Sequence, residues 1–131
     1  MQAMILVYVA GKFSGKTRAA VERNIAAAVD VGVRIAEIGA MPLIPHANSS
    51  HPRFERVQPY QFWIDGTLEL LKRCDAICMV NGWAESSGAT GEKRWAQTHG
   101  MPVFYEHLLE DLKSAIENSK SGIGRIGWRR R

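Results

Sequence analysis

The sequence predicts one α/β domain with a Rossmann-like (flavodoxin-like) three-layer fold, built on a parallel sheet of four or five strands. The first observation is the segment 4–10, an unbroken apolar run typical of a strand that is buried on both faces. The second is that short apolar runs alternate along the chain with longer segments of helical periodicity. Because strands joined in this way run parallel through right-handed crossovers, we expect helices on both faces of the sheet.

Each element follows from its local pattern. The predicted strands are residues 4–10, 41–44, 76–80 and 102–105. The predicted helices are residues 17–38, 59–73, 89–99 and 108–118. Gly39 is typical of a helix stop, and Gly32 is a point where the first helix can bend or break. The segment 46–59 contains two prolines, an asparagine and two serines, and therefore predicts a loop over the ligand-binding end of the sheet.

Length and charge suggest one domain followed by a basic tail. The chain has 131 residues, 46% of them hydrophobic, which can fill one core. We assign residues 1–118 to a single nucleotide-binding domain and residues 119–131 to the tail. Much of the net charge of +4 comes from the tail arginines, which are Arg125, Arg129, Arg130 and Arg131. Such tails usually stay solvated, and no basic stripe with interleaved aromatics occurs elsewhere, so we do not expect a nucleic-acid partner.

Other features argue against a membrane, a metal and a disulfide. No apolar run approaches the roughly 20 residues needed to cross a bilayer, and the first residues do not resemble a secretory signal, so we expect a soluble, cytoplasmic protein. Cys74 and Cys78 are expected to be core thiols. His46 and His51 lie in the predicted loop without a third ligand nearby, so we expect no metal there, and we expect His46 to be solvated. We predict no metal and no cofactor.

The first strand is followed directly by the loop Gly11-Lys12-Phe13-Ser14-Gly15-Lys16-Thr17, which allows two interpretations. A P-loop also ends in Gly-Lys-Thr, but it needs four residues between its glycines, and here there are three. The alternative is a monophosphate site, in which Gly11 lets the backbone approach the ligand and Ser14 and the amides near Gly15 bind the phosphate. Lys12 or Lys16 would then neutralise the phosphate as a point charge.

The loop after the third strand leads into a helix and carries a serine, a glycine and a glutamate. Ser86 and Gly88 precede Glu92 by six and four residues, which places Glu92 in the first turn of the predicted helix. There the simplest role of Glu92 is to cap the helix, since acids are favoured at helix N-termini. Position 89 is alanine, so no strict capping box explains the glutamate.

Together these pieces resemble the nucleoside 2-deoxyribosyltransferase-like superfamily, which includes deoxynucleoside 5′-monophosphate N-glycosidases and small phage and bacterial proteins of largely undefined activity. The resemblance runs through most of the chain. It is carried by Tyr8-Val9-Ala10-Gly11-x-x-Ser14-Gly15, Asp65, Cys74-Asp75-Ala76 and Gly82-Trp83-x-x-Ser86-x-Gly88-Ala89-x-x-Glu92.

The resemblance implies cleavage of the bond between deoxyribose C1′ and a base. Glu92 stands at the position of the nucleophile, Asp65 at that of the second carboxylate, and Tyr8 at that of the first-strand tyrosine. The phosphate-binding positions correspond to Gly11, Ser14, Ser86 and Gly88. Two residues depart from the family pattern, Lys12 in the first loop and Gly91 just before the nucleophile position, and either can alter specificity or remove turnover.

We therefore expect an N-glycosidase or deoxyribosyltransferase that acts on a deoxynucleotide or nucleoside. The alternatives are a nucleotide-binding module without catalysis and, as a weaker one, a P-loop-like phosphotransferase. The superfamily's subunits often share active sites, so a homo-oligomer, a dimer or larger, is expected. Tyr60, Phe62 and Trp63 are candidates for its interface, because aromatic residues are enriched in interfaces.

Overall fold

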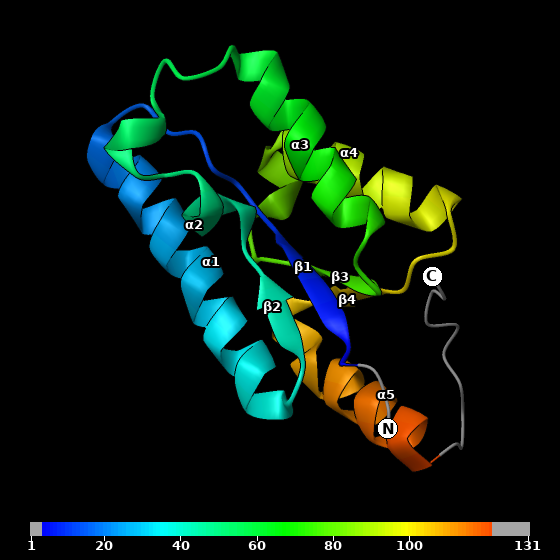
Figure 1. Ribbon diagram of the computed structural model, residues 1–131. Helices are drawn as coiled ribbons and strands as arrows, with labels where there is room; N and C mark the ends of the chain where they lie inside the picture. The colour runs from blue at the N-terminus through cyan, green and yellow to red at the C-terminus, as the bar shows by residue number, and fades with distance from the viewer. Residues whose placement is uncertain (1–3, 122–131) are drawn as a thin grey trace.

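The sheet of this protein has four parallel strands in the order β2-β1-β3-β4. The computed structural model describes residues 4–121 (Figure 1). The strands are β1 (Leu6–Ala10), β2 (Met41–Leu43), β3 (Ala76–Met79) and β4 (Val103–Tyr105). Both neighbours of β1 pair with it in register, Tyr8 opposite Leu43 on one side and Ile77 on the other. The predicted Rossmann-like, three-layer fold is confirmed.

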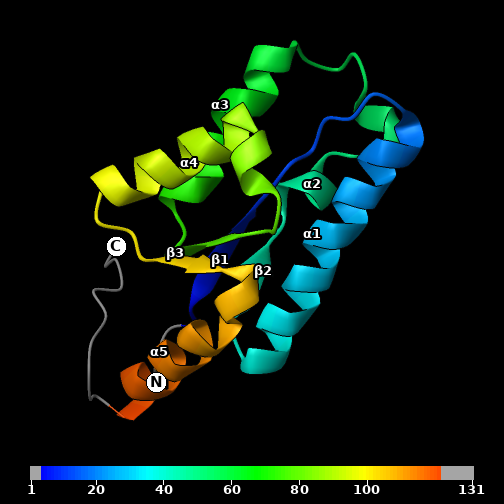
Figure 2. The same ribbon diagram turned by 180° about the vertical axis from the view of Figure 1, so that it is seen from behind.

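Helices cover both faces of the sheet, as Figures 1 and 2 show. On one face lie α1 (Arg18–Ile38) and α5 (Leu109–Ser121), and on the other lie α3 (Tyr60–Lys72) and α4 (Ser87–Thr98). Side chains of β1 alternate between the two cores: Val7 and Val9 pack with α1 and α5, whereas Tyr8 and Ala10 pack on the side of α3 and α4.

Glycines shape the first helix in two ways. Helix α1 begins after Thr17, whose hydroxyl accepts a hydrogen bond from the Ala20 amide, and it ends at Gly39, where φ is 103°. The predicted stop at Gly39 is therefore confirmed. Gly32 does not interrupt the helix; a Cβ at this position would lie 2.4 Å from Ile44 Cδ1, so the glycine allows α1 to pack closely on the segment after β2.

The two cysteines lie in separate cores. Cys74 packs on the side of α3 and α4 and Cys78 on the side of α1 and α5, and both are buried. The prediction of core thiols is confirmed. Between them the buried Asp75 accepts a hydrogen bond from the Leu6 amide at 2.8 Å, so the short Cys-Asp-Ala motif joins the start of β3 to β1.

The predicted loop 46–59 is only partly irregular. It contains most of the one-turn helix α2 (Pro45–Asn48) and the 3-10 turn η1 (Pro52–Phe54). His46 was expected in solvent, but it is 7% exposed, because α2 turns its side chain beneath the first loop. That expectation is therefore wrong for His46. The pattern of prolines and polar residues correctly marked a break between strand and helix but missed this local helical turn.

The order of the strands defines where a ligand would bind. From β1 the chain crosses to β2 on one side, and the next strand, β3, lies on the other side of β1, so the two carboxyl ends form a topological switch point. The loops after Ala10 and Met79 both begin there.

The end of the described chain differs slightly from the predicted boundary. Helix α5 continues to Ser121, and the four tail arginines lie outside the described residues. Within residues 4–121, no helix is long and apolar enough to cross a membrane.

Candidate functional site

Tyr8 and Glu92 meet near the switch point, although 84 positions separate them in the sequence. The Tyr8 phenol, on β1, donates a hydrogen bond to Oε2 of Glu92, on α4. Tyr8 is 1% exposed, so the hydrogen bond joins the central strand to the helix at the edge of the core. The resemblance assigns both residues to one site, and in the structure they are in direct contact.

Burial changes the acid–base properties of both groups. It raises the pKa of Glu92 to about 7, and the hydrogen bond from Tyr8 offsets part of that rise. Burial also raises the pKa of Tyr8, and the negative charge and hydrogen bond of Glu92 raise it further. Tyr8 therefore remains a protonated donor at neutral pH, while Glu92 gains or loses its proton near neutrality.

Glu92 is not in the first turn of its helix, which corrects the sequence-based placement. Helix α4 starts at Ser87, two residues earlier than predicted, so Glu92 falls in the second turn. The cap is Ser86, whose hydroxyl accepts a hydrogen bond from the Ala89 amide at 3.1 Å. The capping role considered for Glu92 is therefore wrong. The helix dipole was expected to lower the Glu92 pKa, but burial raises it.

The second loop and the start of α4 contain glycines with open space beside them. Three residues after the end of β3, the chain turns at Gly82, where φ is 91°, into the 3-10 turn η2 (Trp83–Glu85). A Cβ at Gly88 would have only the Ser86 hydroxyl nearby, at 3.8 Å. A Cβ at Gly91, in the second turn of α4, would meet no atom within 4 Å. The backbone at the start of α4 is therefore accessible.

The first loop is held by its carbonyl groups. The buried His46 contacts the Lys12 carbonyl through Nε2 at 3.1 Å, and because a carbonyl only accepts, Nε2 carries the proton and donates. The Asn24 amide donates to the carbonyls of Phe13 and Ser14 at 3.0 and 3.1 Å. Among residues 4–121 we find no acceptor for the backbone amides of residues 12–16. Several donors in this loop are thus available to an anion.

Two glycines let this loop pack tightly. A Cβ at Gly11 would lie 2.9 Å from Val80 Cβ, so Gly11 brings the end of β1 against the residue that follows β3. A Cβ at Gly15 would lie 2.6 Å from Ala20 Cβ, which keeps the loop against the first turn of α1. Ser14, Lys12 and Lys16 are exposed. Lys12 Nζ lies 3.4 Å from Glu85 Oε2 and so links the two loops.

Asp65 is not in contact with the Tyr8–Glu92 pair. It is exposed on α3 and accepts a hydrogen bond from Gln61 Nε2 at 2.8 Å. From the same helix, Thr67 lowers the Tyr8 pKa, against the larger rise caused by burial and Glu92. The predicted role of Asp65 stays a prediction.

Two residues that hold the site were missed from the sequence. His46 is one. The other is Glu106, whose Oε1 accepts a hydrogen bond from the Asn81 amide at 2.9 Å, while Arg34 lies 3.8 Å from its Oε2. A carboxylate placed directly after the predicted fourth strand was the available signal, because the carboxyl ends of parallel strands share one edge of the sheet.

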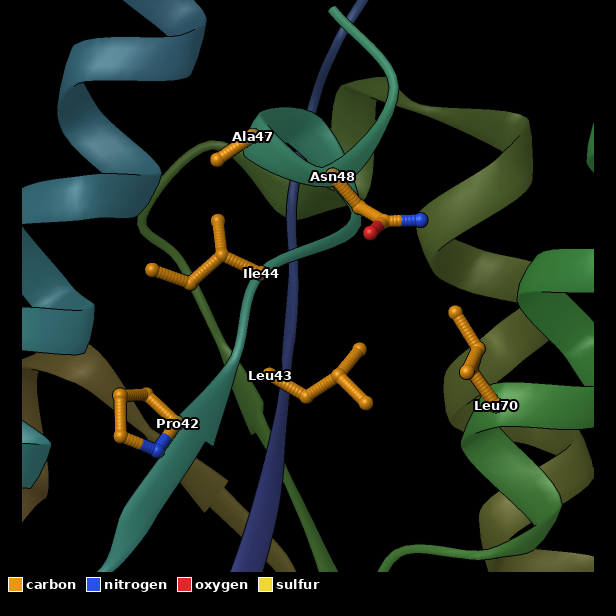
Figure 3. A pocket seen from close by; sticks show the side chains of 6 residues that line it. All are labelled: Pro42, Leu43, Ile44, Ala47, Asn48 and Leu70. Atoms are coloured by element: carbon orange, nitrogen blue, oxygen red, sulfur yellow. The ribbon is translucent and has the colours of Figure 1, made fainter.

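A largely apolar hollow of about 350 Å³ lies between β2, α2 and α3 (Figure 3). It is lined by Pro42, Leu43, Ile44, Ala47, Asn48 and Leu70. One of these residues, Leu43, lies opposite Tyr8 in the register of the sheet, on the strand next to β1. Within residues 4–121, His, Cys, Asp and Glu side chains do not gather in groups of three that could hold a metal ion.

Residues 5–105 match the family model of DUF4406, a domain of unknown function. The chain belongs to this family. The DUF4406 match covers β1, both loops of the switch point, and the Tyr8–Glu92 pair. Comparison with curated proteins gave no match.

Proposed function

We propose that this protein cleaves the bond between deoxyribose C1′ and the base of a deoxynucleoside or its 5′-monophosphate, with Glu92 as the nucleophile. The observation that carries the proposal is the contact between the buried Tyr8 and Glu92 beside the switch point. A carboxyl group whose pKa is raised to about 7 by burial is typical of catalytic sites. The resemblance to the nucleoside 2-deoxyribosyltransferase-like superfamily supplies the reaction class.

In the proposed reaction one Glu92 oxygen attacks C1′ as the bond from C1′ to the base nitrogen breaks. The electron pair of that bond leaves with the base, which is protonated by an acid, and Asp65 is the residue proposed for this role. The product is a glycosyl ester of Glu92. Water, or the nitrogen of a second base, then attacks C1′ and releases the carboxylate.

The role proposed for Tyr8 is to position the nucleophile. Its hydrogen bond to Oε2 holds one carboxylate oxygen and leaves the other for attack. A carboxylate that is partly removed from water loses less solvation when it approaches a carbon centre, and its charge stabilises the oxocarbenium-like transition state. Burial therefore assists the reaction only above the pKa of Glu92, where the group is ionised.

The first loop supports a substrate that carries a phosphate. The amides of residues 12–16, including those of Ser14 and Gly15, are available to phosphate oxygens. The open backbone at Gly88 and the Ser86 hydroxyl, which can still donate its own proton, would complete the site on the other loop.

The two alternatives lack comparable support. A nucleotide-binding module has no need for a half-buried carboxyl group, and removing such a group from water costs stability. A P-loop-like phosphotransferase commonly uses an aspartate after a neighbouring strand to help hold magnesium. Here Asn81 follows β3 and Val80, and its amide donates to Glu106.

The direct test is to incubate the protein with a panel of deoxynucleosides and deoxynucleoside 5′-monophosphates and to measure free base by chromatography. Glu92→Gln serves as the matched control, because it keeps the shape of the side chain and removes the attacking charge. A 2′-fluoro substrate analogue, which slows release of the ester, should add its sugar mass to the wild type only. Release of no base from any member of the panel would overturn the proposal.

A further inference from the structure

The ion pair between Lys12 and Glu85 links the two loops of the switch point. It is the contact between the two switch-point loops in which Lys12 Nζ lies 3.4 Å from Glu85 Oε2. Both side chains are largely exposed, at 45% and 71%. An exposed pair of this kind is weak, so another anion can displace it readily.

The backbone on each side of the pair is anchored. His46 holds the Lys12 carbonyl, and Asn24 holds the next two carbonyls. On the other side, Glu85 lies in η2, whose Trp83 ring is covered by Lys93 Nζ at 4.3 Å from its centroid. Lys12 and Glu85 can therefore change partners by rotating their side chains, with no movement of the loops.

The position of Lys12 connects this pair to the anion-binding amides. Lys12 belongs to the same short loop as the amides of residues 12–16, and its ammonium group is the positive charge that bridges to the second loop. A phosphate dianion on those amides carries more charge than one carboxylate and would attract the ammonium more strongly. Glu85 would then face the phosphate as an uncompensated like charge.

From these contacts we infer that Lys12 and Glu85 form an anion-displaceable latch that sets the selectivity of the site for phosphorylated over unphosphorylated ligands. In the absence of a phosphate, Glu85 neutralises Lys12. When a phosphate binds, Lys12 leaves Glu85 and pairs with the phosphate. Glu85 is thus a specificity residue that weakens phosphate binding. The inference rests on the proposed function only in assigning the phosphate to the first loop.

The test measures binding of inorganic phosphate by titration calorimetry at low ionic strength, and so needs no turnover. Glu85→Gln should tighten phosphate binding about three- to tenfold, and Lys12→Met should weaken it at least about tenfold. The matched control is Glu69→Gln on α3, which removes one charge from a similar exposed pair, with Lys72 at 3.3 Å. The control should leave phosphate affinity within about twofold of the wild type.

A double mutant separates displacement of Lys12 from simple repulsion by Glu85. In a latch, the gain from Glu85→Gln depends on the freed lysine and should fall below half in the Lys12→Met background. A gain that persists in full, an equal gain in Glu69→Gln, or no phosphate binding to the wild type would each overturn the latch. If the protein releases base but its phosphate affinity does not respond to Lys12 and Glu85 as predicted, only the latch is overturned. If the phosphate affinities follow the prediction but no base is released, only the glycosidase proposal is overturned.

Discussion

The phenol of Tyr8, on the central strand, hydrogen bonds to the carboxyl group of Glu92, on the second turn of α4. This contact couples a core tyrosine to the side chain proposed as nucleophile. It leaves Glu92 with a pKa of about 7, raised by burial and partly restored by the tyrosine. Activity, stability and the pH dependence of both should therefore respond to changes in this pair.

Glu92→Gln should abolish most of the proposed cleavage. The amide cannot form the glycosyl ester, so we expect at least about a hundredfold loss in kcat, measured as base release at saturating substrate. Asp65→Asn should lose less on a substrate with a good leaving group, because an acid matters most for a poor one. Near-normal turnover by Glu92→Gln would show that another group attacks the sugar.

The same substitution should change how stability depends on pH. The pKa of Glu92 is about 7 in the folded chain and 4.5 as an ordinary glutamate, so the folded state retains the proton that the unfolded state releases. The contribution of Glu92 to the free energy of unfolding is therefore fully present below about pH 4.5. As the pH rises towards 7, this contribution falls by about 1.4 kcal/mol per pH unit.

Thermal or urea unfolding of the wild type and of Glu92→Gln from about pH 5 to about pH 8 measures this difference. The variant should match the wild type at the acid end and exceed it at neutral pH, because glutamine carries no charge to bury. Parallel curves for the two proteins would mean that Glu92 titrates as an exposed acid.

Tyr8→Phe should shift the pH dependence of activity. For the wild type, kcat/KM should rise with pH through about 7, as Glu92 becomes ionised. Without the tyrosine hydrogen bond, which lowers the Glu92 pKa, the rise should move to higher pH. Activity lost at acidic pH should then recover in alkaline buffer, whereas a uniform loss at every pH would assign Tyr8 a different role.

His46→Ala should loosen the first loop. The substitution removes the donor to the Lys12 carbonyl and leaves a cavity under the loop, which we expect to cost about 1–3 kcal/mol of stability. Phosphate affinity should also fall, because the loop amides lose their fixed arrangement. His51→Ala, an exposed neighbour in the same segment, is the control. Equal effects in the two variants would remove any special role for His46.

Aromatic residues at the start of α3 predict self-association. The Phe62 side chain is 50% exposed and lies edge-on to Trp63, at 5.1 Å between ring centroids. We expect a dimer or larger oligomer at micromolar concentration by light scattering, and we expect Phe62→Ser to shift it towards monomer. Val33→Ser changes a residue of similar exposure, 53%, on the opposite face of the sheet and should have no such effect. A monomeric wild type would contradict the prediction.

Local patterns in the sequence were sufficient for the architecture. A buried parallel strand must be apolar on both faces, and the run before Gly11 shows this directly. Gly39 could be recognised as a helix stop because few other residues adopt a positive φ without strain. These signals depend only on residues close together in the chain. Local composition also predicts that the first and second loops each follow directly on a strand.

What the tertiary structure decided is the environment of each side chain. Solvation and long-range contacts determine whether His46 is a solvated loop residue or a buried support, and no neighbouring residue in the sequence reports them. The same holds for Glu92, whose pKa depends on burial and on a tyrosine 84 positions away. The Lys12–Glu85 pair likewise exists only because β1 and β3 are adjacent. Electrostatic free energies depend on distance in space and on exclusion of water, and only the packed chain determines these.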